Sequence, residues 1–140
     1  MSSCWGWLAV SNITIDQLGV AITAQLNTFE KSVREGVKKA VDETMDEMIR
    51  ETRSTAQVRT GRYKRKISAT VGENTLMSYS KVWHVKKPDY RLAHLLDKGH
   101  AFRDGRRYSG NQHVANAGRH AVDNFQRRIE EVIHDAGSEN

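Results

Sequence analysis

The segment YRLAHLLDKGH, residues 90–100, has the clearest local pattern in the chain. Three leucines recur in it at helical spacing: Leu92, Leu95 and Leu96. With Gly99 as a stop signal, this spacing predicts a short amphipathic helix. Residues 100–112 are polar and rich in glycine and arginine, which predicts a flexible loop, and HVANA at 113–117 opens a final helix.

Upstream of this segment, apolar residues keep a helical repeat for about 40 residues, from Thr14 to Arg53, which corresponds to roughly 60 Å of helix. The members of the repeat are Leu18, Ile22, Leu26, Phe29, Val33, Val37, Ala40, Met45, Met48 and Ile49. A helix of this length cannot bury its whole apolar stripe within one subunit of 140 residues. Part of it is therefore expected to contact a neighbour. A coiled coil is the rival interpretation, but the apolar spacing drifts and strand patterns follow.

Between the long helix and residue 90, the period of the pattern changes to two. Residues 62–71 alternate basic or polar side chains with partly apolar ones, which predicts a strand. Turn residues follow at 72–75, and residues 76–85 predict a second strand that Pro88 closes. An antiparallel hairpin alone is marginal, so it needs a helix on one face and further strands, from residues 100–114 or from another subunit.

The last helix carries a single apolar face and stops near Gly137. This face holds Val114, Ala117, Ala121, Val122, Phe125, Ile129, Val132 and Ile133. We expect the first and last helices to pack on the sheet, which gives an α+β fold. The predicted organisation is a flexible N-terminal arm at 1–12, one α+β domain at 13–137 and a free C-terminus at 138–140.

Composition limits the function classes. The formal net charge of +5 and the sequence pI of about 9.5 permit an acidic partner without identifying one. The mean hydropathy of −0.67 is low for a self-sufficient globule, and no segment approaches the length of a membrane span. The start of the chain lacks the features of a secretory signal, and the lone Cys4 excludes an internal disulfide.

The six histidines invite a catalytic or metal interpretation. However, His94, His100, His113 and His120 match no usual zinc spacing. A histidine–asparagine nuclease site built on His113, His120 and Asn111 is a third and weaker hypothesis. We expect no catalytic, metal or cofactor site, because phosphate-loop and nucleophile motifs are also missing from the sequence.

Two basic clusters are candidate contact sites. Alternation would place Arg62, Lys64 and Lys66 on one strand face, where they could meet DNA phosphates. A solvated hairpin face is the favoured interpretation, and a nucleic-acid-binding module built on the 59–66 strand is the alternative function. The second cluster lies in the 100–112 loop between two aromatic residues, a combination typical of protein interfaces. The candidate interface residues are Trp83, Phe102, Arg103, Arg106, Arg107 and Tyr108.

The order helix, glycine, basic loop, helix over residues 90–117 resembles the head–tail joining and tail-completion family of tailed bacteriophages. Those proteins carry a block much like YRLxHLLxKGH, a glycine- and arginine-rich loop, and then H-[IV]-x-x-A before a terminal helix. Asn116 stands where that family often has proline. The Thr60–Gly61 pair resembles the same family, in which such a pair joins the long helix to the first strand. The resemblance extends from Asn12 to Ile133.

The resemblance implies a structural virion protein with no catalysis. Such a protein forms a homo-oligomeric ring, expected to be a hexamer, at the neck of the particle. Its partners would be copies of itself, the adjacent head-side connector and tail-tube proteins, and the genomic DNA that passes through. It would assemble in the host bacterial cytoplasm, without any membrane.

Overall fold

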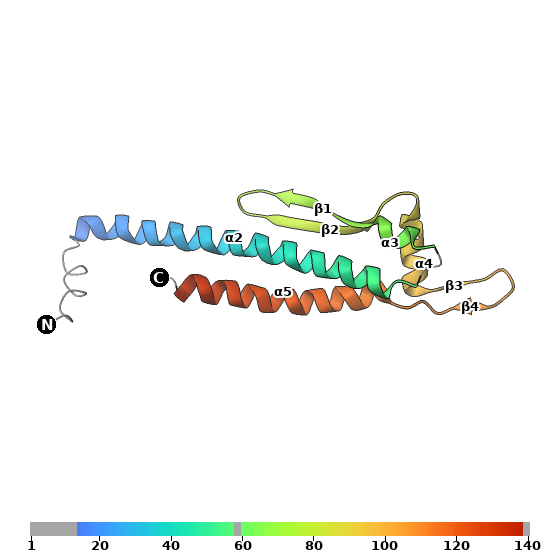
Figure 1. The fold of residues 1–140 in the computed structure, drawn as a ribbon. Helices are drawn as coiled ribbons and strands as arrows, with labels where there is room; N and C mark the ends of the chain where they lie inside the picture. The colour runs from blue at the N-terminus through green and yellow to red at the C-terminus, as the bar shows by residue number, and fades with distance from the viewer. Residues whose placement is uncertain (1–13, 58–59, 139–140) are drawn as a thin grey trace.

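The computed structural model describes residues 14–57 and 60–138, so the predicted arm at 1–12 and residues 139–140 lie outside the described part. Two long helices, α2 (Ile15–Thr55) and α5 (His113–Ser138), lie antiparallel and give the molecule the shape of a rod (Figure 1). Both helices agree closely with the predicted ranges. Side chains bridge the pair along its length, and Arg128 donates to Thr44 Oγ1 at 3.0 Å.

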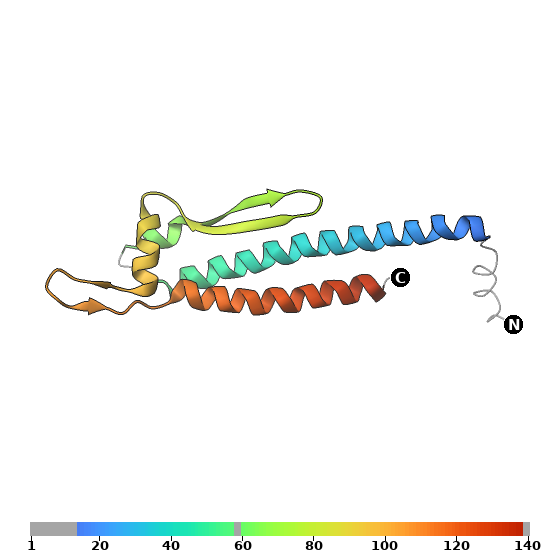
Figure 2. The same ribbon diagram turned by 180° about the vertical axis from the view of Figure 1, so that it is seen from behind.

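The predicted antiparallel hairpin forms between β1 (Ile67–Asn74) and β2 (Tyr79–Val85). The second strand starts at Tyr79 rather than at residue 76, because residues 75–78 make the turn. The hairpin runs back along α2, as Figure 2 shows from behind. Several contacts hold it there; among them, Tyr79 Oη donates to Asp42 Oδ1 at 2.7 Å, and Trp83 Nε1 donates to Thr52 Oγ1 at 3.2 Å.

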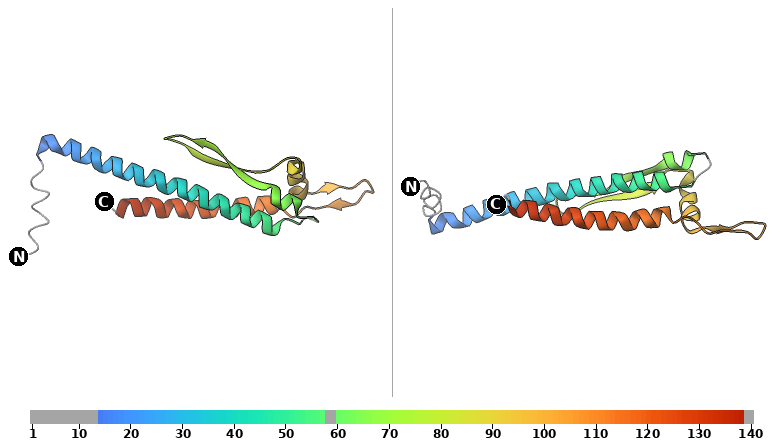
Figure 3. Two further views of the ribbon diagram at one scale, coloured as in Figure 1. Left: turned by 45° about the horizontal axis from the view of Figure 1, so that its top comes forward. Right: turned by 60° about the horizontal axis from the view of Figure 1, so that its bottom comes forward.

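The α+β class is confirmed, with one difference in the packing. The last helix was expected to pack on the sheet, but α5 packs against α2, which lies between α5 and the hairpin (Figures 1 and 2). One long helix therefore covers two elements. Its C-terminal two-thirds lie against α5 and the hairpin, whereas its N-terminal segment extends beyond both (Figure 3).

The predicted strand over 62–71 is wrong in its first half. Residues Arg62–Lys66 form the short helix α3, and the strand starts only at Ile67. Tyr63 and Ile67 are both buried and are four residues apart, a spacing that fits one face of a helix as well as one face of a strand. Gly61, at φ +70°, lets the chain turn into this helix, so the Thr60–Gly61 pair leads into α3 and not directly into the first strand.

The segment from residue 89 to residue 108 crosses one end of the rod. It consists of the 3₁₀ helix η2 (Asp89–Arg91), the predicted helix α4 (Leu92–Lys98), and a small antiparallel pair, β3 (His100–Ala101) with β4 (Arg107–Tyr108). This pair forms its own sheet and does not extend the β1–β2 hairpin, so among the described residues the hairpin has two strands. Gly99 ends α4 at φ +88°, and a Cβ there would lie 2.1 Å from the carbonyl oxygen of Tyr108.

The core lies where these elements meet. Ala56, Tyr63, Ile67 and Val85 are its buried members, and further apolar side chains from α2, β2 and α4 pack around them. This position joins the end of α2, the base of the hairpin and α4 into one body. None of the helices in the described ranges has the length and apolar character needed to cross a membrane.

Candidate functional site

The N-terminal segment of α2 carries an uncovered apolar stripe. Four residues at helical spacing are between 49% and 90% exposed: Ile15, Leu18, Ile22 and Leu26. We call them the bare stripe. The same face of the helix continues to Ala40 and Thr44, which are buried. The cover ends because α5 and the hairpin both stop short of this segment, as all the views in Figure 3 agree.

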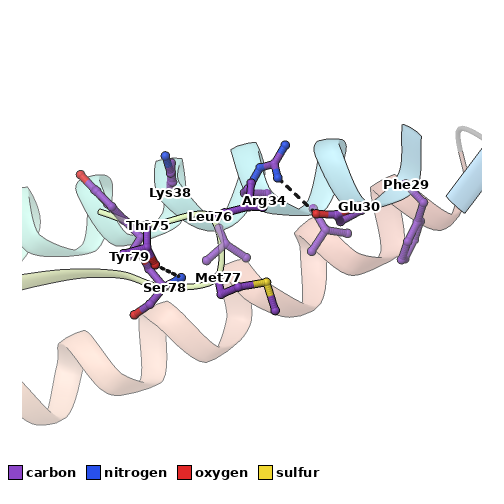
Figure 4. Close-up of a pocket in the computed structure, with 11 residues that line it drawn as sticks. Phe29, Glu30, Arg34, Lys38, Thr75, Leu76, Met77, Ser78 and Tyr79 are labelled. Carbon is purple, nitrogen blue, oxygen red and sulfur yellow. Dashed lines mark hydrogen bonds and ion pairs between the residues drawn. The ribbon is translucent and has the colours of Figure 1, made fainter. Parts of the chain in front are cut away.

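A groove lies next to the bare stripe, between α2 and the tip of the hairpin (Figure 4). It has a volume of about 570 Å³, and its apolar lining consists of Phe29, Val33, Val37, Leu76 and Met77. We call it the tip groove. Met77 is 89% exposed. Arg34 and Glu30 form an ion pair of 3.2 Å at its edge. The groove is therefore an apolar surface that no described part of the chain fills.

The predicted DNA-facing strand surface does not exist, because its residues lie on α3. Arg62 is held by Asp89, to whose Oδ2 its Nε donates at 2.9 Å, and the Asp89 side chain is buried. This contact raises the pKa of the Arg62 guanidinium. Lys64 and Lys66 are half-buried and have no ion pair among the described residues. Arg59, the first cation of the predicted 59–66 strand, lies outside the described residues.

The predicted interface residues in the 100–112 loop lie on the small β3–β4 hairpin, which projects from the end of the rod (Figure 1). Phe102, Arg103 and Arg107 are exposed, whereas the ring of Tyr108 lies 5.6 Å from that of His100. Arg106 donates from Nε to Asp104 Oδ2 at 2.6 Å, and this contact lowers the pKa of Asp104. Their role in an interface stays a prediction.

Trp83 is placed differently from the other interface candidates. Its side chain packs against the core, and its indole N–H donates a hydrogen bond to Thr52 Oγ1. The tryptophan thus joins β2 to α2 within one subunit.

The histidines do not gather into a metal site. No group of three histidine, cysteine or acidic side chains that could hold an ion occurs within 14–57 and 60–138. His113 is instead buried in a polar network: its Nδ1 lies 2.8 Å from Asn111 Oδ1, and its Nε2 lies 3.0 Å from Tyr63 Oη. Burial lowers the pKa of His113, and burial followed by the charge of Asp97 raises the pKa of Tyr63 to about 12.

This network could suggest catalysis, but its position argues for structure. It lies under the first turn of α5, where Asp97 Oδ1 accepts the backbone N–H groups of Val114 and Ala115 at 2.8 and 3.2 Å. A carboxylate in this position caps the helix and opposes its dipole. His120, the other member of the nuclease hypothesis, lies on the exposed side of α5 and contacts Glu51 at 2.6 Å. His113 and His120 therefore make contacts with different residues and do not form one site.

Sequence reasoning missed both the tip groove and the cap that Asp97 provides. The groove depends on where the hairpin turns, and Leu76 and Met77 were expected within a strand. The only available signal was their apolar character next to the turn residues Gly72–Thr75.

Comparison with known proteins gives one family. The family model described as "Bacteriophage HK97-gp10, putative tail-component" matches residues 21–99. This range includes most of α2, the β1–β2 hairpin and α4. No curated protein and no solved structure matches the chain.

Proposed function

The family match covers more than half of the chain, so the chain belongs to the HK97-gp10-like family of bacteriophage tail components, and we propose that it builds a ring of identical subunits at the neck of the particle. A tail component is a structural part of the virion. In our proposal the ring completes the tail and joins it to the head by binding alone. Its partners are further copies of the chain, the head-side connector and the tail-tube proteins, and six copies would match tail-tube symmetry. Assembly takes place in the cytoplasm of the host bacterium.

The observation that carries this proposal is the bare stripe. A helix segment of 14 residues, 15–28, projects from the folded body with its apolar face in solvent. Burying the exposed parts of the four side chains would contribute roughly 4–8 kcal/mol. A surface of this kind marks a binding site, because soluble proteins seldom leave a contiguous apolar patch uncovered without a function.

We propose that the occupant of the tip groove is the bare stripe of the next subunit. Both surfaces are apolar, and they lie on different parts of the same chain. When one patch fits a different patch on an identical neighbour, the contact repeats head to tail and can close into a ring. Association costs about 4–15 kcal/mol in lost freedom, so one such contact is weak. Ring closure gives every subunit two contacts.

The experiment measures the molar mass of the purified chain by light scattering over a wide concentration range. Wild type is expected to assemble as concentration rises. Ile22→Glu places a carboxylate in the bare stripe and is expected to leave monomers. Val20→Glu is the matched control, because Val20 is exposed on another side of the same turn and should assemble like wild type. A wild-type chain that stays monomeric at every concentration and is missing from purified virions overturns the proposal.

A mixing experiment tests the head-to-tail geometry. Met77→Glu disables the groove, whereas Ile22→Glu disables the stripe, so each variant alone should be monomeric. Mixed together, they retain one intact stripe and one intact groove, and they should form dimers that cannot grow. Val82→Glu, on an exposed position of β2 away from the groove, is the control for Met77→Glu. Dimers of Met77→Glu on its own would instead indicate that two stripes pair with each other, and monomers in the mixture would exclude pairing of the stripe with the groove.

A further inference from the structure

The basic residues of this chain are concentrated at one end of the rod. Residues 60–108 contain twelve lysines and arginines against four acidic residues. The two long helices together contain nine lysines and arginines and twelve acidic residues. The net positive charge of the chain therefore comes from the segment that forms α3, the hairpin, α4 and the β3–β4 pair. Apart from the hairpin, these elements lie together at the end opposite the bare stripe (Figure 1).

The acidic residues at this end are already engaged. Asp89 holds Arg62, Asp104 holds Arg106, and Asp97 caps α5 through the N–H groups of Val114 and Ala115. Glu73 lies away from this end, at the tip of the hairpin, where it accepts the hydroxyl of Ser78 at 2.6 Å.

Nine cations at this end have no ion-pair partner within the described part of the chain. They are Lys64, Arg65, Lys66, Lys86, Lys87, Arg91, Lys98, Arg103 and Arg107, and we call them the basic end. The segments that supply them lie close together in part. The end of α3 lies beside the residues after β2, because the backbone N–H of Lys86 donates to the carbonyl of Lys66 at 2.9 Å, and η2 leads directly into α4. The cations are thus concentrated at one end of the rod and are not spread along its length.

We propose that the basic end binds the phosphate backbone of double-stranded DNA without reading its sequence. Five of the nine cations are lysines, which are depleted in protein–protein interfaces but are ordinary contacts to phosphates. The cations lie on turns, on the short strand β4 and on helices of at most seven residues, so no long helix presents them to a groove of the duplex. This inference concerns a different surface from the bare stripe and does not rest on ring formation.

Binding to a backbone has a measurable signature. Each phosphate contact releases counterions, and the logarithm of the binding constant falls with the logarithm of the salt concentration by about 0.9 for each contact. With four to six of the cations in contact at once, the slope would be about −4 to −5. Duplexes of equal length and different sequence should bind with the same affinity.

The experiment measures fluorescence anisotropy of a labelled 30-base-pair duplex at salt concentrations from 50 to 400 mM. The test variant combines Arg65→Gln, Lys86→Gln and Lys98→Gln, which are exposed and make no side-chain hydrogen bond within the described residues. The control combines Lys31→Gln, Lys39→Gln and Arg127→Gln, which remove the same charge from the long helices. The test variant should lose about 100- to 500-fold in affinity at 100 mM salt and about 2.7 in slope. The control should lose less than about threefold.

A second measurement uses the unaltered protein, so that a folding defect in the variant cannot decide the result. Lysine acetylation read by mass spectrometry should be slowed by the duplex at Lys64, Lys66, Lys86, Lys87 and Lys98. Lys31 and Lys39 should react as before. Equal losses in both triple variants, or equal protection of all lysines, would overturn the proposal in favour of general charge attraction. Failure of the protein to bind the duplex at 50 mM salt would overturn it in favour of an acidic protein as partner.

Discussion

The phenol oxygen of Tyr63 lies 3.0 Å from Nε2 of His113, which is 50 positions further along the chain. The other ring nitrogen of His113 lies 2.8 Å from the carbonyl oxygen of Asn111, which can only accept, so Nδ1 carries the proton and Nε2 accepts from Tyr63. This buried chain of hydrogen bonds joins α3 to the first turn of α5. It thereby links the short helix that follows α2 to the segment that leads into α5.

Replacing Tyr63 with phenylalanine should destabilise the subunit. The substitution removes the hydroxyl and leaves the buried Nε2 of His113 without a donor, which costs about 1–3 kcal/mol. Urea unfolding at a fixed protein concentration measures the loss. Tyr90→Phe is the control, because the Tyr90 hydroxyl is on the surface and only accepts from Arg91. A Tyr63→Phe variant as stable as the control would mean that the hydrogen bond contributes nothing.

The burial of His113 predicts a loss of stability in mild acid. Burial lowers the pKa of His113 below its ordinary value of 6.5. The unfolded chain therefore takes up a proton before the folded chain does, and the free energy of unfolding falls as the pH drops below about 6.5, by at most about 1.4 kcal/mol per pH unit. Unfolding measured at pH 7.5 and pH 5.5 should show this dependence in wild type and a weaker one in His113→Gln.

This acid effect can be separated from that of the carboxylates. Hydrogen bonds from Lys81 and Tyr79 lower the pKa of Asp42, and a hydrogen bond from Arg128 lowers the pKa of Glu47. Stabilisation from these two groups is present above their ordinary pKa values of 3.8 and 4.5 and is lost only at lower pH. Equal pH dependence of wild type and His113→Gln between pH 7.5 and 5.5 would exclude His113 as the cause.

The cap provided by Asp97 predicts an ordered series of variants. Asp97→Ala removes the acceptor for the N–H groups of Val114 and Ala115 and should cost about 1–2 kcal/mol. Asp97→Asn keeps an acceptor but loses the charge that opposes the helix dipole, so it should cost only about 0.3–1 kcal/mol. Thermal unfolding followed by circular dichroism gives the order. If Asp97→Asn and Asp97→Ala lower the free energy of unfolding equally, the cap acts only through the charge of Asp97.

The long elements were predictable, because their patterns extend over many turns. The helical repeat extends from Leu18 to Ile49, and α2 was predicted to within two residues at each end. The helix Arg62–Lys66 was not predictable, because a segment of five residues fits the period of a helix as well as that of a strand. Only the packing of Tyr63 in the folded chain distinguishes the two. The contact of Asp97 with α5 spans 17 positions, and no local pattern in the sequence encodes it.

The candidate sites were predictable in kind but not in place. The length of α2 implied that part of its stripe must meet a neighbour, but only the end of α5 at Ser138 decides that residues 15–26 are the uncovered part. The positive charge was visible in the sequence. The distribution of the unpaired charge was not, because Arg62 is bound by the buried carboxylate of Asp89, 27 positions away, whereas Lys86 and Lys98 have no ion-pair partner among the residues that the structure describes.

α2 and α5 approach each other closely at Gly36, and a methyl group there should disturb their packing. A Cβ at Gly36 would lie 2.5 Å from Cγ1 of Val132. Glycine within a helix is otherwise about 1 kcal/mol less favourable than alanine, so Gly36→Ala gains propensity but must push α5 away. We expect the steric cost to exceed the gain in helix propensity, with a net loss of about 1–3 kcal/mol in the free energy of unfolding.

Gly19→Ala is the control, because nothing lies within 4 Å of its Cβ position, and it should stabilise the chain by about 0.5–1 kcal/mol. Combining Gly36→Ala with Val132→Ala removes the clash. Urea unfolding of wild type, the two single variants and the double variant should therefore give a favourable coupling of about 1 kcal/mol or more between the two sites. Additive losses would show that α5 does not approach α2 at Gly36 as closely as 2.5 Å implies.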